Sequence, residues 1–142
     1  MADRVAGMDA RTPGIQHRGR YLHVDCRGAD AALWAERCRA FADVSLARDV
    51  SRVLVDATDC EAVGQRALRD ALTQLVLAGI AGGLRLALVT NVPGVRAAFV
   101  TLERDLLVVD IWVKLFAHDK DALEWLLARE PAPRSEGARS VA

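Results

Sequence analysis

A short apolar run constrains this chain more than any other feature. The residues Val53–Val55 stand together without a polar residue between them, and Asp56 follows directly. A strand that is apolar on both faces is normally a central strand with a layer packed on each side. Thr58 and Asp59 then mark the point where the chain leaves the core. We therefore expect residues 51–58 to form the middle strand of a small α/β domain.

Strand and helix patterns alternate along the rest of the chain. Residues 84–90 form a second apolar run, residues 109–116 alternate as an edge strand does, and Arg18-Gly19 is the expected turn of a hairpin within 15–28. Apolar periodicity predicts four helices, at about residues 30–44, 62–78, 93–107 and 120–129. The expected fold is α/β: a mostly parallel sheet of four to five strands built from successive βα units, with an antiparallel N-terminal edge hairpin and about four helices.

Several side chains have an expected environment. Leu68, Ala71, Leu72 and Leu75 share one face of the second predicted helix, so this stripe should lie on the sheet. Trp34 and Phe41 should belong to the core. His23 alternates with apolar residues in the hairpin, which places it on the polar, solvated side.

Charge and cysteine content bound the classes of function. The 19 basic and 19 acidic side chains cancel, whereas binding to nucleic acid or to an anionic membrane requires a basic excess. Three widely spaced cysteines favour buried free thiols in a reducing compartment over disulfides. The longest uncharged apolar stretch, residues 75–84, is too short to span a bilayer. We expect a soluble, cytoplasmic protein with one domain at 15–130, a disordered leader at 1–14 and a disordered tail at 131–142.

Three segments, taken in order, carry a family likeness. They are the strand Val53–Asp59, the strand Leu86–Thr90, and the ending Val113–Phe116 followed by Asp121–Leu126 with its A-x-x-W-L pattern. Together they resemble the SpoIIAA-like group, relatives of the STAS domains of anti-sigma-factor antagonists. The resemblance implies a parallel sheet with sequential strand order. It also implies a mostly non-enzymatic repertoire: protein–protein regulation in STAS domains, and binding of apolar ligands in the distantly similar CRAL-TRIO lipid carriers.

One departure from the family pattern bears on function. The STAS switch reads Asp-Ser-Ser-Gly at the start of the helix after the central strand, whereas the matching positions Gly64–Ala67 read Gly-Gln-Arg-Ala. A phosphate at that helix end would act as a charge switch, but no hydroxyl is present there to accept one. The resemblance therefore favours an interaction module without the phosphorylatable serine.

No catalytic motif stands out, and we expect no enzyme activity, no metal and no cofactor. The three histidines lack the i, i+4 spacing of a helical metal site. Polar residues follow the two buried strands at their carboxyl ends, where open parallel sheets bind ligands. These default ligand candidates are Asp56, Thr58, Asp59 and Asn91. The alternative is that the same side chains cap helices and satisfy loop backbone groups.

The helix expected at 93–107 leaves two functions open. Its expected buried stripe consists of Val95, Phe99, Leu102 and Leu106, and the helix is apolar over more than one face. That breadth indicates either deep burial or a surface shared with a partner. The first hypothesis is a non-catalytic regulatory module that binds another protein or a second copy of itself as a homodimer. The second is a small carrier or sensor that binds an apolar, lipid-like molecule between the sheet and this helix.

Overall fold

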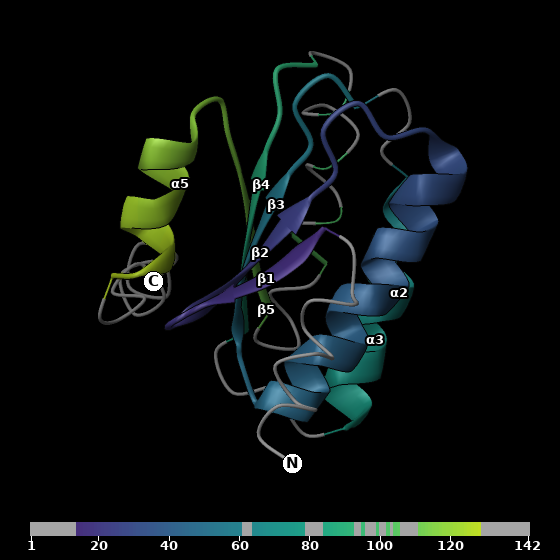
Figure 1. The fold of residues 1–142 in the computed structure, drawn as a ribbon, viewed down its shortest axis with the longest axis vertical. Coiled ribbons are helices and arrows are strands. Elements are labelled where there is room, and N and C mark those ends of the chain that lie inside the picture. The colour runs from purple at the N-terminus through teal and green to yellow at the C-terminus, as the bar shows by residue number, and fades with distance from the viewer. Residues whose placement is uncertain are drawn as a thin grey trace, which may run out of the picture.

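A five-stranded sheet forms the centre of the domain. The computed structural model describes residues 14–60, 64–78, 84–92, 95, 99, 102, 104–105 and 111–128. The strands are β1 (Ile15–Arg18), β2 (Tyr21–Asp25), β3 (Arg52–Asp56), β4 (Leu84–Val89) and β5 (Ile111–Phe116). They lie in the order β1-β2-β3-β4-β5, with β1 antiparallel to β2 and all other pairs parallel (Figure 1). The predicted α/β class, the mostly parallel sheet and the antiparallel edge hairpin are confirmed.

The middle strand is the one that the apolar run predicted. Val53 and Val55 point into the larger core, which also contains the α2 and α3 stripes, and Leu54 points into a smaller core on the opposite face. All three side chains are no more than 1% exposed. Both faces of this strand are covered, so apolar side chains are favoured on each of them. Its sequence therefore shows no alternation with polar residues.

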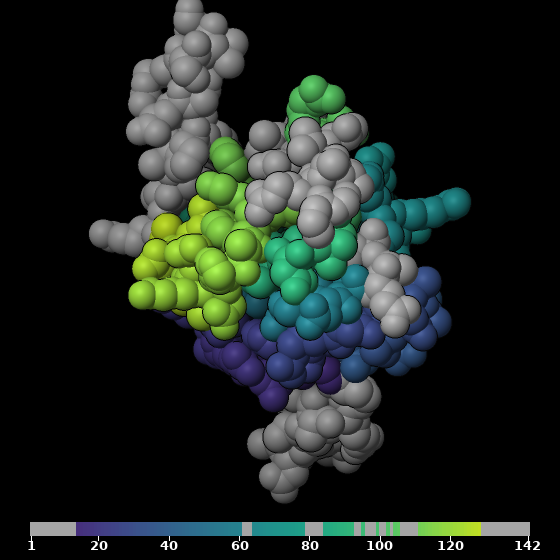
Figure 2. Space-filling model, turned by 90° about the horizontal axis from the view of Figure 1, so that it is seen from above, coloured from purple at the N-terminus to yellow at the C-terminus, as the bar shows by residue number. Residues whose placement is uncertain are grey.

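The helices lie in two layers. Helices α2 (Ala31–Arg48) and α3 (Gln65–Leu77) pack against each other on one face, and α5 (Asp119–Leu126) lies on the other (Figure 1). Seen from above, the yellow-green atoms of α5 and the blue atoms of α2 lie on opposite sides of the molecule (Figure 2). The Asp30 side chain caps α2 by accepting a hydrogen bond from the Leu33 N–H at 2.9 Å.

The predicted core residues of α2 and α3 are confirmed. The buried stripe of α3 consists of Leu68, Ala71, Leu72 and Leu75. Trp34 and Phe41 are also buried, and the Trp34 indole donates a 2.9 Å hydrogen bond to the Gly64 carbonyl. That bond ties the first turn of α2 to the residue that precedes α3.

The hairpin turn lies one residue later than predicted. Arg18 pairs with Tyr21, so the two turn residues are Gly19 and Arg20 rather than Arg18 and Gly19. Gly19 has φ +68, and glycine at the first position of a two-residue turn is typical of type II′ hairpins. The sequence identified the glycine correctly, but only the strand register decides which neighbour shares the turn.

Three helices have defined bounds in the described part of the chain, against about four predicted. Within the predicted 93–107 helix, Val95, Phe99 and Leu102 are helical and buried, and Arg104 and Asp105 are helical and exposed. The other residues of that predicted helix lie outside the described residues. The predicted leader, apart from Gly14, and the tail also lie outside them. None of the described helices is long and apolar enough to cross a membrane.

A buried arginine anchors α5 to the sheet. Arg85 on β4 is only 3% exposed. Its Nη1 donates to the carbonyls of Trp125, Leu126 and Ala128 at 3.1, 3.2 and 2.8 Å. The last carbonyls of a helix lack partners within the helix and carry partial negative charge, which a guanidinium satisfies. The position of α5 over β3, β4 and β5 therefore depends on this side chain as well as on apolar packing.

Candidate functional site

The structure brings the four predicted ligand candidates together in two pairs. Asp56 Oδ1 accepts hydrogen bonds from the Thr58 N–H at 3.1 Å and from the Thr58 hydroxyl at 2.6 Å. The Asn91 amide donates to Asp59 Oδ1 at 2.9 Å, and Asn91 Oδ1 accepts from the Asp59 N–H at 2.9 Å. These contacts hold the loops that follow β3 and β4, as the structural alternative predicts. Whether the same side chains also bind a ligand stays a prediction.

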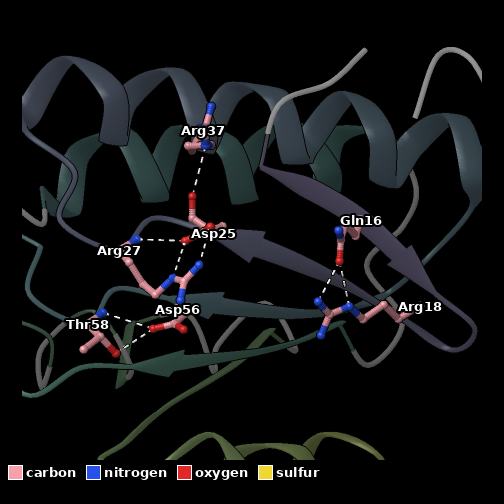
Figure 3. A network of polar contacts seen from close by, with 7 residues as sticks. All are labelled: Gln16, Arg18, Asp25, Arg27, Arg37, Asp56 and Thr58. Atoms are coloured by element: carbon pink, nitrogen blue, oxygen red, sulfur yellow. Dashed lines mark hydrogen bonds and ion pairs between the residues drawn. The ribbon is translucent and has the colours of Figure 1, made fainter. Parts of the chain in front are cut away.

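Next to Asp56 lies an ion pair that sequence reasoning missed. Asp25 stands opposite Asp56 in the β2–β3 register. The Arg27 guanidinium binds both carboxylate oxygens of Asp25, Nε to Oδ1 and Nη2 to Oδ2, each at 3.0 Å (Figure 3). Hydrogen bonding to Arg27 lowers the pKa of the Asp25 carboxyl below its ordinary value, so this pair is fully charged at neutral pH.

The Asp25–Arg27 pair is exposed yet held in place. The side chains are 37% and 64% exposed, respectively. The Arg27 N–H also donates to Asp25 Oδ1 at 3.1 Å, and Arg37 from α2 donates to the Asp25 carbonyl at 3.1 Å (Figure 3). Four hydrogen bonds thus fix one carboxylate and the backbone that carries it. A guanidinium held in this way presents a preset geometry to a partner.

His23 differs from its predicted environment. It lies on the polar side of β2 as expected, but it is half-buried rather than solvated. Burial is the main cause that lowers the pKa of His23 below 6.5, and the positive charge of Arg18 lowers it further. The physical reason is the sheet register, which places His23 between Gln16 on β1 and Leu54 on β3 and so covers both flanks of the ring. The imidazole is therefore mainly neutral at physiological pH.

These residues share one polar surface, which we call the open polar face. It consists of the side chains of Gln16, Arg18, His23, Asp25 and Arg27. They line a hollow of about 250 Å³, and Arg18 donates to Gln16 at 2.9 and 2.6 Å within it (Figure 3). Helix α5 packs on β3, β4 and β5, so within the described residues no helix covers β1 and β2 on this side. Tyr21 marks the boundary, because it packs against the smaller core under α5.

The described side chains offer little covalent or metal chemistry. Across the described ranges, no group of three histidine, cysteine or carboxylate side chains comes together to hold a metal ion. Cys26, Cys38 and Cys60 are buried thiols outside any disulfide, as predicted. Burial raises the pKa of the Cys26 thiol to about 12 and also raises the pKa of Cys38, so both stay protonated and poorly nucleophilic at neutral pH.

The three apolar candidates lie in the interior. Val95 is 8% exposed, Phe99 and Leu102 are fully buried, and all three belong to the larger core beneath α2 and α3. None of them is among the described residues that line the hollow between β1 and β2 or two other surface hollows. Their contribution here is to packing, and the apolar-ligand hypothesis stays a prediction.

The family likeness can be compared with the fold but not with relatives. The sequential strand order agrees with what the SpoIIAA-like resemblance implies. Parallel βα connections allow this strand order among others, so it describes the architecture and identifies no family. Comparison of the chain with protein-family models, with curated proteins and with solved structures finds no match, and the family assignment therefore stays a prediction.

Proposed function

We propose that the protein is a non-catalytic regulatory module that binds a protein partner through the open polar face. The observation that carries this proposal is the half-covered sheet. Helix α5 covers three strands, and the remaining face on β1 and β2 carries charged side chains with ordered hydrogen bonds. The SpoIIAA-like resemblance, with its missing phosphorylatable serine, supports a role in protein interaction without a phosphate switch.

The residue types on this surface suit a protein interface. Arginine and tyrosine are enriched among the residues that dominate binding energy, and Arg18, Arg27 and Tyr21 lie on or beside the face. Asp25 and Gln16 already orient the two guanidinium groups, which reduces the entropy lost on binding. The hollow of about 250 Å³ is smaller than the range of about 300–1,000 Å³ typical of small-molecule sites. A protein surface that brings carboxylate side chains to Arg18 and Arg27 fits these features best.

Paired variants test the proposal. Immobilised wild-type protein, the face variant R18A/R27A and the control variant R66A/R104A are exposed to the same cell extract, and the retained proteins are quantified by mass spectrometry. Arg66 and Arg104 are also exposed, and both belong to helical segments rather than to β1 or β2. Circular dichroism confirms that all three proteins are folded.

The proposal expects at least one protein that binds the wild type and the control alike and is depleted about tenfold or more on the face variant, since each charge-assisted bond contributes about 1.5–3 kcal/mol. A retained set that is the same on all three proteins contradicts it. Binding that fails only on the control variant contradicts it as well, because the docking surface would then lie on the helical side.

A further inference from the structure

The outer surface of helices α2 and α3 carries features that the proposed function does not use. The two helices pack side by side on the face of the sheet opposite α5 (Figure 1). Each of them connects two parallel strands, so both run in the same direction. A surface hollow of about 330 Å³ lies between them, with Arg39 on the α2 side and Asp70 and Gln74 on the α3 side. The helix pair therefore presents opposite charges on the two sides of one hollow.

The two charges stand at about the same level of the helix pair. The Gln74 amide donates a hydrogen bond to Asp43 Oδ1 at 3.4 Å, which aligns these two positions. Arg39 lies four residues before Asp43 on α2. Asp70 lies four residues before Gln74 on α3, so both charges are about one turn nearer the start of their helices. Both are exposed, and within the described part of the chain neither takes part in an ion pair.

A leucine follows each charge at the same spacing. Leu46 lies seven residues after Arg39 on α2. Leu77 lies seven residues after Asp70 on α3. Seven residues are about two turns, so each leucine lies on the same side of its helix as the charge. Leu77 is 82% exposed, and Leu46 is partly buried. Each helix thus presents one charge and one leucine at matching levels, and the two charges are opposite in sign.

We propose that this surface of α2 and α3 is the interface of a homodimer with two-fold symmetry. A two-fold axis parallel to the helices places α2 of one protomer against α3 of its partner and keeps every residue at its level. Arg39 then meets Asp70 of the partner subunit, and Leu46 meets Leu77 of the partner subunit. An interface between identical protomers must be complementary to itself, and this surface meets that requirement in charge and in apolar character.

Two further features of the structure agree with a second copy as the occupant. Ala35, Ala67 and Ala71 line the hollow, so no large side chain within it holds the partner helices away. Leu22 and Val24 point into the core under α2 and α3, so His23 and the open polar face lie on the other side of the sheet. The dimer therefore leaves that face accessible on both protomers.

Charge reversal tests the dimer in the full chain. Light scattering after size exclusion gives the mass of each protein up to high micromolar concentration, and the wild type is expected to form a dimer. R39D and D70R each bring like charges together at both contacts, so the dimer dissociation constant should rise about tenfold or more. A mixture of R39D with D70R restores opposite charges at both contacts. The two variants should therefore dimerise with each other more tightly than either does alone.

K120D is the matched control, because Lys120 is exposed on α5 in the other helix layer, and it should dimerise as the wild type does. L77S should weaken the dimer as the charge reversals do, and circular dichroism checks that every variant is folded. A wild type that stays monomeric at every concentration overturns the proposal. A dimer that R39D and D70R weaken no more than K120D does overturns it too. So does a mixture of the two variants that dimerises no better than each variant alone.

Discussion

Replacing Arg85 by methionine should detach α5 from the sheet while leaving the rest of the fold in place. The methionine keeps most of the apolar stem of the side chain and removes the guanidinium. Three carbonyls at the end of α5 then lose the donor that they share.

The expected loss in the free energy of unfolding depends on how well water can replace that donor. The bonds to Trp125 and Ala128 are partly buried, so water can reach those carbonyls, whereas the bond to Leu126 is buried. A buried carbonyl left without a partner costs about 1–3 kcal/mol. Loss of the cation from the helix C-terminus adds about 1 kcal/mol. We therefore expect the free energy of unfolding to fall by about 2–4 kcal/mol.

Urea unfolding measures the total loss in the free energy of unfolding. Amide hydrogen exchange shows which part of the fold is destabilised. Amides of residues 123–128 should lose protection before those of β3 do. The matched control is R52M, because Arg52 stands opposite Arg85 in the β3–β4 register but is only partly buried, and it should lose less than about 1 kcal/mol. Equal stability of R85M and R52M, or unchanged protection in α5, would refute the anchoring role.

Three further predictions concern the core, His23 and the thiols. Leu72→Ala should lower the free energy of unfolding by about 2–5 kcal/mol in urea titrations, because the side chain is fully buried, and a loss below 1 kcal/mol would contradict the packing described here. Because the pKa of His23 is lowered in the folded state, its neutral form contributes stability that is fully present above pH 6.5 and is lost as the pH falls below that value. The urea midpoint of His23→Gln should therefore decline less than that of the wild type on acidification below pH 6.5, and parallel curves would be inconsistent with this account. Because burial raises the pKa of Cys26 to about 12, its thiol should react with iodoacetamide only in urea-unfolded protein, and rapid labelling of folded protein would show that it is accessible.

Much of the fold could be predicted because its signals are local. The continuous run Val53–Val55 identified the central strand, and periodic leucines identified the buried face of α3. Asp30, which caps α2, is of a residue type typical of the position before a helix. Each of these patterns depends on the geometry of a single helix or strand and on whether one or both of its faces are buried.

The polar site could not be predicted in the same way, because it depends on register and on loop geometry. Arg27 contacts Asp25 from a turn over residues 26–29, and neither residue is unusual in sequence. His23 is half-buried because of its neighbours on two other strands. Arg85 is the exception, because its position can be interpreted from the sequence. A single cation within an apolar strand indicates that its guanidinium has a buried hydrogen-bond acceptor.

The central claim is that α5 covers β3, β4 and β5 and leaves the polar face of β1 and β2 open. NMR with methyl labelling and a soluble paramagnetic probe tests this claim most directly. The account predicts contacts from Ala122 and Leu126 on α5 to Leu54 and Val89, together with strong relaxation by the probe at Gln16, Arg18 and Arg27. Contacts between α5 and His23, or shielding of Arg18 and Arg27 from the probe in the isolated protein, would show that the polar face is closed and would contradict the proposed docking surface.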